Sequence, residues 1–231
     1  MRMPNWLSLN GQIYEEGVVG VAMAGQIEFD VIVSQGCRPI DEPYVITKAE
    51  GNVVGEIAGR PTIHVLSEIL EALPEKDKKL SENALFVGIV MNENQTNFRR
   101  GDFLIRNIVG FDPESGSLMV GALLKAGQTI QFQLRDCETS AEDLKILLEK
   151  LKSKTDASSR GAPPHGGAGA LLVSCCGRGR GLYGVPDHDA KMIQRLSGPL
   201  ALAGFFANGE IGPIGEKNYI HGYTSSLGIF R

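Results

Sequence analysis

The sequence predicts a mixed α+β fold, in which a few helices pack on a mixed, largely antiparallel sheet. Short apolar runs bounded by turn residues recur along the chain, as expected for buried strands. The 29 glycines suit tight connections between such strands. Longer segments place leucine and isoleucine at helical spacing instead, which predicts the packed helices.

The predicted strands are apolar or alternate between apolar and polar residues, and turn-forming residues separate them. The first two are expected to pair with each other across a turn at Gly25, and the next two to form a hairpin around Gly51. In chain order, the expected strands cover residues 17–25, 27–33, 44–48, 53–57, 84–91, 103–110, 118–120, 129–134, 170–173, 200–206 and 219–230.

Helices are predicted where the apolar spacing changes to the helical period. A proline suits the first turn of one helix and Pro74 ends it, while a threonine or serine caps the next. The expected helices cover residues 61–73, 141–152 and 187–196. Residues 76–82 are expected to be a charged, solvated connection. Residues 154–169, rich in Ser, Gly, Pro and Ala, are expected to be a flexible, linker-like loop.

Composition excludes several classes of protein. The chain has 231 residues and a net charge of −4, which disfavours a nucleic-acid partner. No apolar run reaches the roughly 18–20 residues of a membrane helix, and the N-terminus lacks a secretory pattern. The four cysteines show no disulfide framework, which is typical of the reducing cytosol. We therefore expect a cytoplasmic protein with neither a membrane nor a nucleic-acid partner.

The most distinctive stretch is GALLVSCCGRGRG at residues 169–181, where an apolar run leads into two cysteines and a glycine-arginine turn. Glycines let a ligand approach the backbone, and an arginine suits a carboxylate or a phosphate. The next strand is followed by Asn208, Gly209 and Glu210. We expect Arg178 and Glu210 to face a common hollow, where they would bind the carboxylate and the amine of an amino acid.

The same residues permit other interpretations. The glycines after Arg178 satisfy G-x-G-x-x-G, the turn of dinucleotide-binding folds, although the next helix starts late for that role. Cys175 with His221 as its base would predict a cysteine-dependent enzyme. A direct salt bridge between Arg178 and Glu210 would hold the turns together and bind nothing. Because no metal-ligand spacing is present, we predict neither a metal nor another cofactor.

Several motifs resemble the FIST family, which comprises bacterial signal-transduction domains and eukaryotic F-box proteins. SCCGRGRGLYG, LAGFFANGEIGP and IHGYTSSLGIF are similar to the C-terminal half of these proteins, and SQGCRPI, TKAEGN and GDFLIRNIVGFDPESG also match. The resemblance covers roughly residues 30–231. It implies a FIST C-terminal domain over residues 34–231 and only a remnant of the N-terminal half over residues 1–33.

The resemblance implies a sensory domain for a small polar ligand such as an amino acid. The resemblance also implies an alternative function, a protein-interaction module as in the F-box relatives. As partners beyond the ligand, we expect either a second copy of the chain or a protein that supplies the missing N-terminal half. The expected ligand-binding residues are Cys175, Gly177, Arg178, Gly179, Asn208, Gly209, Glu210 and His221.

Overall fold

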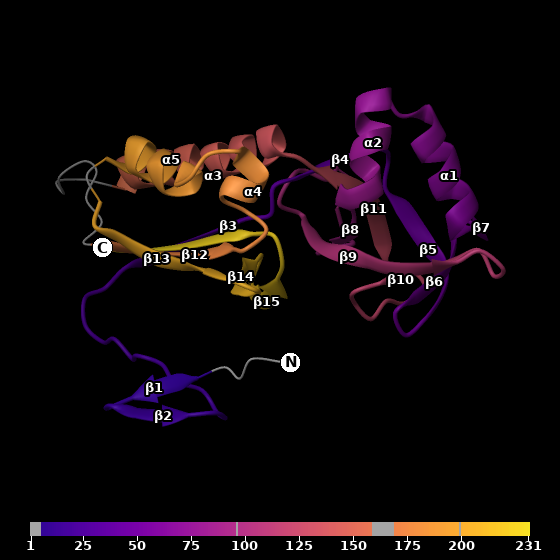
Figure 1. The fold of residues 1–231 in the computed structure, drawn as a ribbon. Helices are drawn as coiled ribbons and strands as arrows, with labels where there is room; N and C mark the ends of the chain where they lie inside the picture. The colour runs from indigo at the N-terminus through magenta and orange to yellow at the C-terminus, as the bar shows by residue number, and fades with distance from the viewer. Residues whose placement is uncertain (1–5, 96, 159–168, 199) are drawn as a thin grey trace.

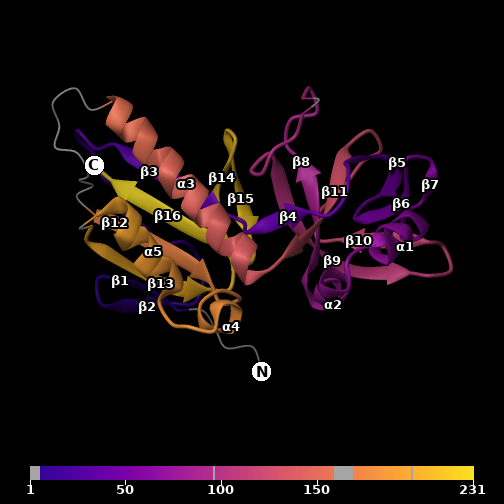
Figure 2. The same cartoon turned by 90° about the horizontal axis from the view of Figure 1, so that it is seen from above.

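The structure is a computed structural model that describes residues 6–95, 97–158, 169–198 and 200–231. Figure 1 shows two lobes beside each other and an N-terminal arm that extends from one of them. The view from above separates a barrel-like lobe from a lobe in which helices lie over a sheet (Figure 2). All strand pairs but one are antiparallel in the described chain, so the predicted α+β class with a largely antiparallel sheet is confirmed.

The barrel lobe takes its strands from one continuous stretch of the chain. These strands are β4 (Cys37–Pro39), β5 (Tyr44–Glu50), β6 (Val53–Ile57), β7 (Arg60–Pro61), β8 (Leu85–Val90), β9 (Phe103–Asp112), β10 (Ser117–Val120) and β11 (Thr129–Arg135). Six of them pair in the order β10-β9-β8-β11-β5-β6, and β10 pairs with β6 in turn, which closes the barrel. The hairpin predicted around Gly51 is the β5–β6 pair.

The barrel core forms because side chains alternate between the two faces of each strand. Along β11, Ile130 and Phe132 lie in the core and are 0% exposed. Gln131 and Gln133 alternate with them and face the junction with the second lobe. Helix α1 (Thr62–Ala72) covers one side of the barrel with its apolar face, as its helical spacing predicts.

The charged residues 76–82, expected to be a connection, form the helix α2 (Glu75–Ala84) instead. Lysine and glutamate are good helix formers, and acidic residues in the first turn interact favourably with the helix dipole. Glu75 and Asp77 occupy that first turn. Arg38 Nη2 of β4 donates to Asp77 Oδ1 at 2.6 Å, which ties α2 to the barrel.

The second lobe is a four-stranded sheet whose strands come from both ends of the chain. In spatial order they are β13 (Leu202–Ala207), β12 (Gly169–Cys175), β16 (Ser225–Phe230) and β3 (Phe29–Ser34). The helices α3 (Cys137–Ser158) and α5 (His188–Ser197) cover one face, where Leu144, Ile193 and Leu227 are 0% exposed (Figure 1). No helix in the described part of the chain is long and apolar enough to cross a bilayer.

Near the N-terminus one strand prediction is wrong, and another strand has a different partner from the predicted one. Residues 17–25 have no regular structure, and Val18 is 96% exposed, because no strand of the described chain pairs with them. The run at 27–33 is β3, which pairs with β16 rather than with its predicted neighbour. The N-terminal arm, residues 6–28, carries only the small hairpin of β1 (Leu7–Leu9) and β2 (Gln12–Tyr14).

The C-terminal part differs from its prediction at two points. The single strand expected over residues 219–230 is divided into β15 (Lys217–His221) and β16 by a turn at Tyr223, whose φ is +63°. β15 forms a hairpin with β14 (Glu210–Ile214). Helix α3 continues to Ser158, so the expected loop is helical at its start, and residues 159–168 lie outside the described residues.

Candidate functional site

The glycine-arginine turn after β12 is built around a buried arginine. The side chain of Arg178 is 0% exposed, and its Nε donates to Asp189 Oδ2 at 2.7 Å. Its Nη2 donates to Asp189 Oδ1 at 3.2 Å and to the Tyr183 hydroxyl at 2.6 Å. Burial alone would lower the pKa of Arg178, but the Asp189 carboxylate raises it above its ordinary value. The predicted anion fork therefore binds a carboxylate of the protein itself.

Glu210, the expected counterpart of Arg178, has a separate partner. Its Oε2 accepts a hydrogen bond from the Thr224 hydroxyl at 2.7 Å and from the Thr224 amide at 3.3 Å. The residue is 1% exposed at the start of β14. Within the described residues no hydrogen bond or ion pair joins Arg178 to Glu210, so these interactions give no support to an amino acid bridging the two side chains.

The other predicted ligand residues are divided between the interior and the surface. Cys175 and His221 are buried, and the His221 Nε2 donates to the Gly212 carbonyl at 3.0 Å. Burial lowers the pKa of His221, which favours the neutral form of its ring. Asn208 and Gly209 form an exposed turn between β13 and β14.

The two glycines of the turn allow close packing of aromatic rings. A Cβ atom at Gly177 would lie 2.6 Å from the ring of Tyr223. One at Gly179, whose φ is +66°, would lie 2.9 Å from the ring of Phe206. Gly179 also lines a pocket of about 260 Å³, here called the strand-end pocket, with Ser174, Asp187, His188, Asp189, Phe205 and Phe206 among its other lining residues.

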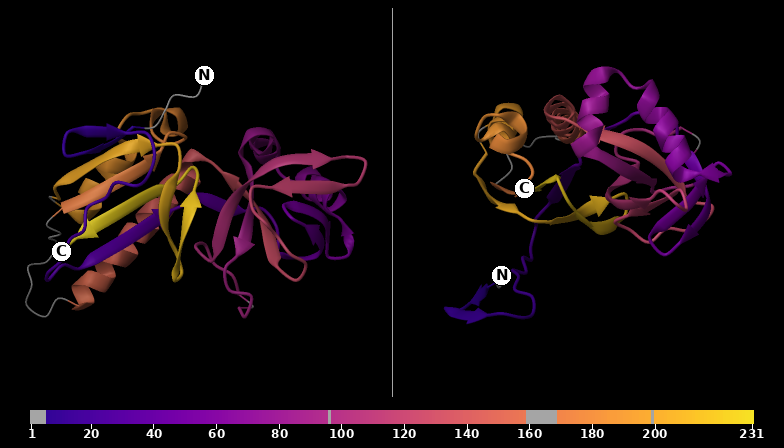
Figure 3. Two further views of the ribbon diagram at one scale, coloured as in Figure 1. Left: turned by 90° about the horizontal axis from the view of Figure 1, so that it is seen from below. Right: turned by 45° about the vertical axis from the view of Figure 1, so that its right-hand side comes forward.

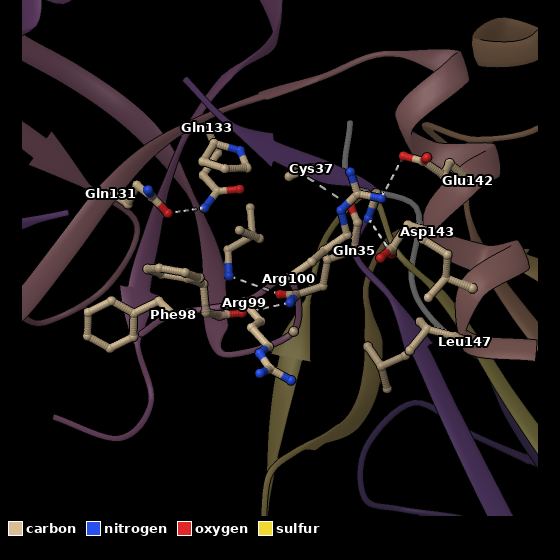
Figure 4. Close-up of a pocket in the computed structure, with 17 residues that line it drawn as sticks. Gln35, Cys37, Phe98, Arg99, Arg100, Gln131, Gln133, Glu142, Asp143 and Leu147 are labelled. Atoms are coloured by element: carbon tan, nitrogen blue, oxygen red, sulfur yellow. Dashed lines mark hydrogen bonds and ion pairs between the residues drawn. The ribbon is translucent and has the colours of Figure 1, made fainter. Parts of the chain in front are cut away.

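A larger cavity of about 380 Å³ lies where the barrel meets the second lobe (Figure 4). We call it the junction cavity. Its walls come from the β3–β4 turn, β11, the loop before β9 and the first turns of α3. The lining residues are Val33, Gln35, Gly36, Cys37, Pro39, Phe98, Arg99, Arg100, Gly101, Phe103, Ile105, Gln131, Gln133, Glu142, Asp143, Ile146 and Leu147.

Asp143 of α3 fixes the β3–β4 turn against the cavity. Its Oδ2 accepts hydrogen bonds from the Ser34 hydroxyl at 2.8 Å and from the Gly36 amide at 3.0 Å. Gly36 has a φ of +67°, and a Cβ atom there would lie 2.6 Å from Ser140 Oγ. Ser140 donates to the Gly36 carbonyl at 3.2 Å, so the helix and the turn contact each other without intervening side-chain bulk.

Gln35 joins the same turn to the barrel. Its Nε2 donates to the Phe103 carbonyl at 2.7 Å, and its Oε1 accepts from the Ile105 amide at 2.9 Å. This side chain thus pairs with β9 as a neighbouring strand would. The turn is therefore held by α3 on one side and by the barrel on the other, which makes it a rigid wall between the two lobes.

Two arginines of the loop before β9 lie at the cavity. Arg100 Nη1 binds Glu142 Oε2 of α3 at 2.9 Å, and this ion pair links the barrel loop to the second lobe (Figure 4). Arg99 is exposed, and its guanidinium has no partner among the described side chains. The cavity thus combines guanidinium groups on the barrel side with the Glu142 and Asp143 carboxylates on the α3 side.

A layer of buried charge connects the cavity to the predicted turn. Arg135, at the end of β11, is 7% exposed, donates to the Gly177 carbonyl at 3.3 Å and lies over the ring of Tyr223. Arg135 Nε and Arg178 Nη1 are buried without a hydrogen-bond partner. Burial raises the pKa of Cys37, which lines the cavity, to about 12, although Arg135 and Arg178 act against this rise.

The cysteines are expected to differ strongly in their reactivity with a thiol reagent. Cys137 and Cys176 are exposed, whereas Cys37 and Cys175 are buried. Since the thiolate is the reactive form, the high pKa of Cys37 disfavours its alkylation further. In native protein, iodoacetamide followed by intact-mass measurement should add two labels quickly, and four after unfolding in urea. Fast labelling of Cys175 in the native state would instead favour the cysteine-enzyme interpretation.

None of the residues that line the junction cavity is among the predicted ligand residues. The segment SQGCRPI was noted only as a match to the family, and Gln35, Arg100 and Asp143 carry no local pattern. These three residues come from three separate segments, the β3–β4 turn, the loop before β9 and α3. The segments meet only after the barrel has closed, so no local pattern could predict the cavity. Arg38 of that segment binds Asp77 and Asp136 and does not line the cavity.

Comparison with known proteins finds two family models and several uncharacterized relatives. The model of the FIST C domain matches residues 63–213, and that of the FIST N domain matches residues 1–60. An uncharacterized protein of Mycobacterium tuberculosis strain H37Rv is 43% identical over 218 residues, which cover 94% of this chain and 55% of that protein. An uncharacterized Mycobacterium bovis protein matches at the same identity over 54% of its length. An uncharacterized Methanocaldococcus jannaschii protein is 29% identical over 156 residues, 63% of this chain and 29% of its own length. The chain thus spans about half the length of its mycobacterial relatives.

Proposed function

The chain belongs to the FIST family, whose domains are sensory and signalling domains, and we propose that its junction cavity binds a small zwitterionic molecule, an amino acid in particular. The observation that carries this proposal is the placement of opposite charges around one cavity. Arg99 and Arg100 can bind a carboxylate, and Glu142 and Asp143 can bind an ammonium group. Phe98 and Ile105 add apolar surface for a side chain.

The size of the cavity agrees with this assignment. Small-molecule sites are typically about 300–1,000 Å³. The junction cavity, at about 380 Å³, lies at the lower end of that range, where a ligand the size of an amino acid fits. The strand-end pocket is smaller, at about 260 Å³.

The position of the cavity suits a sensor. Its walls come from both lobes, and the Arg100–Glu142 ion pair crosses between them. A ligand carboxylate would compete with Glu142 for Arg100, so binding would alter a contact between the lobes. A ligand can change the arrangement of the lobes only if it binds one arrangement more tightly than another, and competition for Arg100 would supply that difference. The four free cysteines are compatible with such a sensor acting in the cytosol.

A thermal-shift screen with the twenty protein amino acids tests the proposal. At 100 times Kd a ligand stabilises a protein by about 2.7 kcal/mol, which raises the melting temperature of a domain of this size by about 5–10 °C. Asp143→Asn should abolish that shift, because it removes the charge while its amide oxygen can still accept from Ser34 and Gly36.

The matched control is Asp187→Asn, which removes an exposed carboxylate from the strand-end pocket. It should leave the ligand-induced shift unchanged. A shift that survives Asp143→Asn and disappears in Asp187→Asn would transfer the site to the strand ends. If no amino acid stabilises the wild type, the proposed ligand class is wrong.

A further inference from the structure

In the described part of the chain, the helices that pack on the four-stranded sheet lie on one of its faces. The inner face carries Ile32, Leu172 and Leu227, which pack against α3 and α5. In Figures 1 and 3 no helix lies over the opposite face, here called the outer face. The strand register places a second set of side chains there, and it includes Val31 of β3 and Leu171 of β12.

The outer face is apolar and exposed. Phe29, Leu171 and Phe205 are 55%, 51% and 66% exposed, on β3, β12 and β13 in turn. The β14–β15 hairpin covers only the end near the barrel, where Gly212 lies against Val33. An apolar patch that extends across several strands of one face usually marks an interaction surface.

The N-terminal arm has apolar side chains exposed on the same side of the sheet. Figure 1 shows β1 and β2 beyond the outer face, opposite the helices, and the view from below agrees (Figure 3). Trp6, Val18 and Val21 are 68%, 96% and 86% exposed. β1 and β2 pair only with each other among the described strands, so the arm has no core of its own.

We propose that the outer face and the arm together bind the remaining part of a FIST N half. The FIST N match covers residues 1–60. Within it, β3 belongs to the four-stranded sheet and residues 37–60 belong to the barrel, so the described arm, residues 6–28, is the part of the match without a core. The mycobacterial relatives carry a little under half of their length beyond the segment that matches this chain. A folded segment of that kind would bury both exposed apolar surfaces at once, because they lie on one side of the sheet.

Co-expression tests this proposal. The tagged chain is produced together with an untagged polypeptide, the part of the Mycobacterium tuberculosis relative that lies outside the match. We expect the two to copurify as a 1:1 complex, identified by intact mass and by light scattering after size exclusion. Leu171→Asp combined with Phe205→Asp should reduce recovery of the complex at least tenfold, because each buries a charge in the interface.

The control is Phe111→Asp, a change of an equally exposed aromatic residue on the barrel strand β9, which should leave the complex intact. Both charge variants should keep the circular dichroism spectrum of the wild type, since the altered side chains are exposed. A complex that tolerates the outer-face changes would overturn the proposal. So would a chain that dimerises alone through this face, because the occupant would then be a second copy.

Hydrogen exchange gives a second readout that does not depend on the solubility of the separate segment. In this chain β13 is an edge strand of its sheet, and the proposal expects the amides of the corresponding strand in the intact Mycobacterium tuberculosis relative to exchange at least tenfold more slowly. The strand corresponding to β9 should exchange similarly in both proteins. Equal exchange of β13 in the two proteins would contradict the proposal.

Discussion

Replacing Asp189 by asparagine should lower the free energy of unfolding by about 3–5 kcal/mol, the usual cost of removing one partner of a buried ion pair. Arg178 is 0% exposed in its side chain, and Asp189 accepts from both its Nε and its Nη2. The variant leaves the guanidinium in the interior without a countercharge. Urea unfolding followed by circular dichroism measures the loss.

Asp187→Asn is the matched control, because Asp187 lies two residues away with its side chain 68% exposed. Exposed ion pairs contribute about 0–1 kcal/mol, so this variant should unfold almost as the wild type does. Asparagine also tolerates the left-handed conformation of that residue, whose φ is +61°. Equal stability of the two variants would show that Arg178 does not depend on Asp189.

The same ion pair predicts how stability responds to acid. Burial raises the pKa of Asp189, but the hydrogen bonds and the charge of Arg178 lower it by more. The net pKa therefore lies below its ordinary value of 3.8. A lowered pKa contributes stability above the unfolded value, and that contribution is lost as the pH falls through the folded value. The lowered pKa of His221 acts in the same direction below about pH 6.5. The wild type should lose more stability than Asp189→Asn between pH 5 and pH 2.

Gly36→Ala should cost about 2–5 kcal/mol, from a left-handed backbone conformation and an overpacked contact together. The φ of Gly36 is +67°, and the added Cβ would lie 2.6 Å from Ser140 Oγ and 3.0 Å from Ser140 Cα. The backbone of α3 would have to move away from the β3–β4 turn. Since Asp143 bonds to Gly36, the shape of the junction cavity would change as well.

Gly51→Ala separates the two contributions. Gly51 has a similar φ of +60°, but nothing lies within 4 Å of the added Cβ. This variant should therefore lose only about 1–2 kcal/mol, the cost of the left-handed conformation. Urea unfolding of both variants gives the difference, which measures the contact between Gly36 and α3. Equal losses would mean that this contact contributes little.

Local patterns predicted much of the fold, and the failures have physical causes. The hairpin around Gly51 and the helix after Pro61 follow from turn chemistry and apolar spacing, and both are present. Residues 17–25 were predicted as a strand because they are apolar, but a strand also needs a pairing partner. Residues 76–82 were predicted as a connection because they are polar, although α2 buries none of its residues and needs no apolar stripe.

The contacts of the candidate site could not be predicted from the sequence, because a charge in the sequence does not reveal its partner. Arg178 and Glu210 are complementary and follow neighbouring strands, yet Arg178 binds Asp189 and Glu210 binds Thr224. Gln35 joins the junction cavity only through the closed barrel, which no local pattern predicts.

A crystal structure of the protein with the amino acid that stabilises it most tests the central claim most directly. The account predicts electron density for the ligand in the junction cavity, with its carboxylate on Arg99 or Arg100 and its ammonium group on Asp143 or Glu142. Density in the strand-end pocket beside Ser174 and Phe206, with the junction cavity filled by water alone, would contradict it.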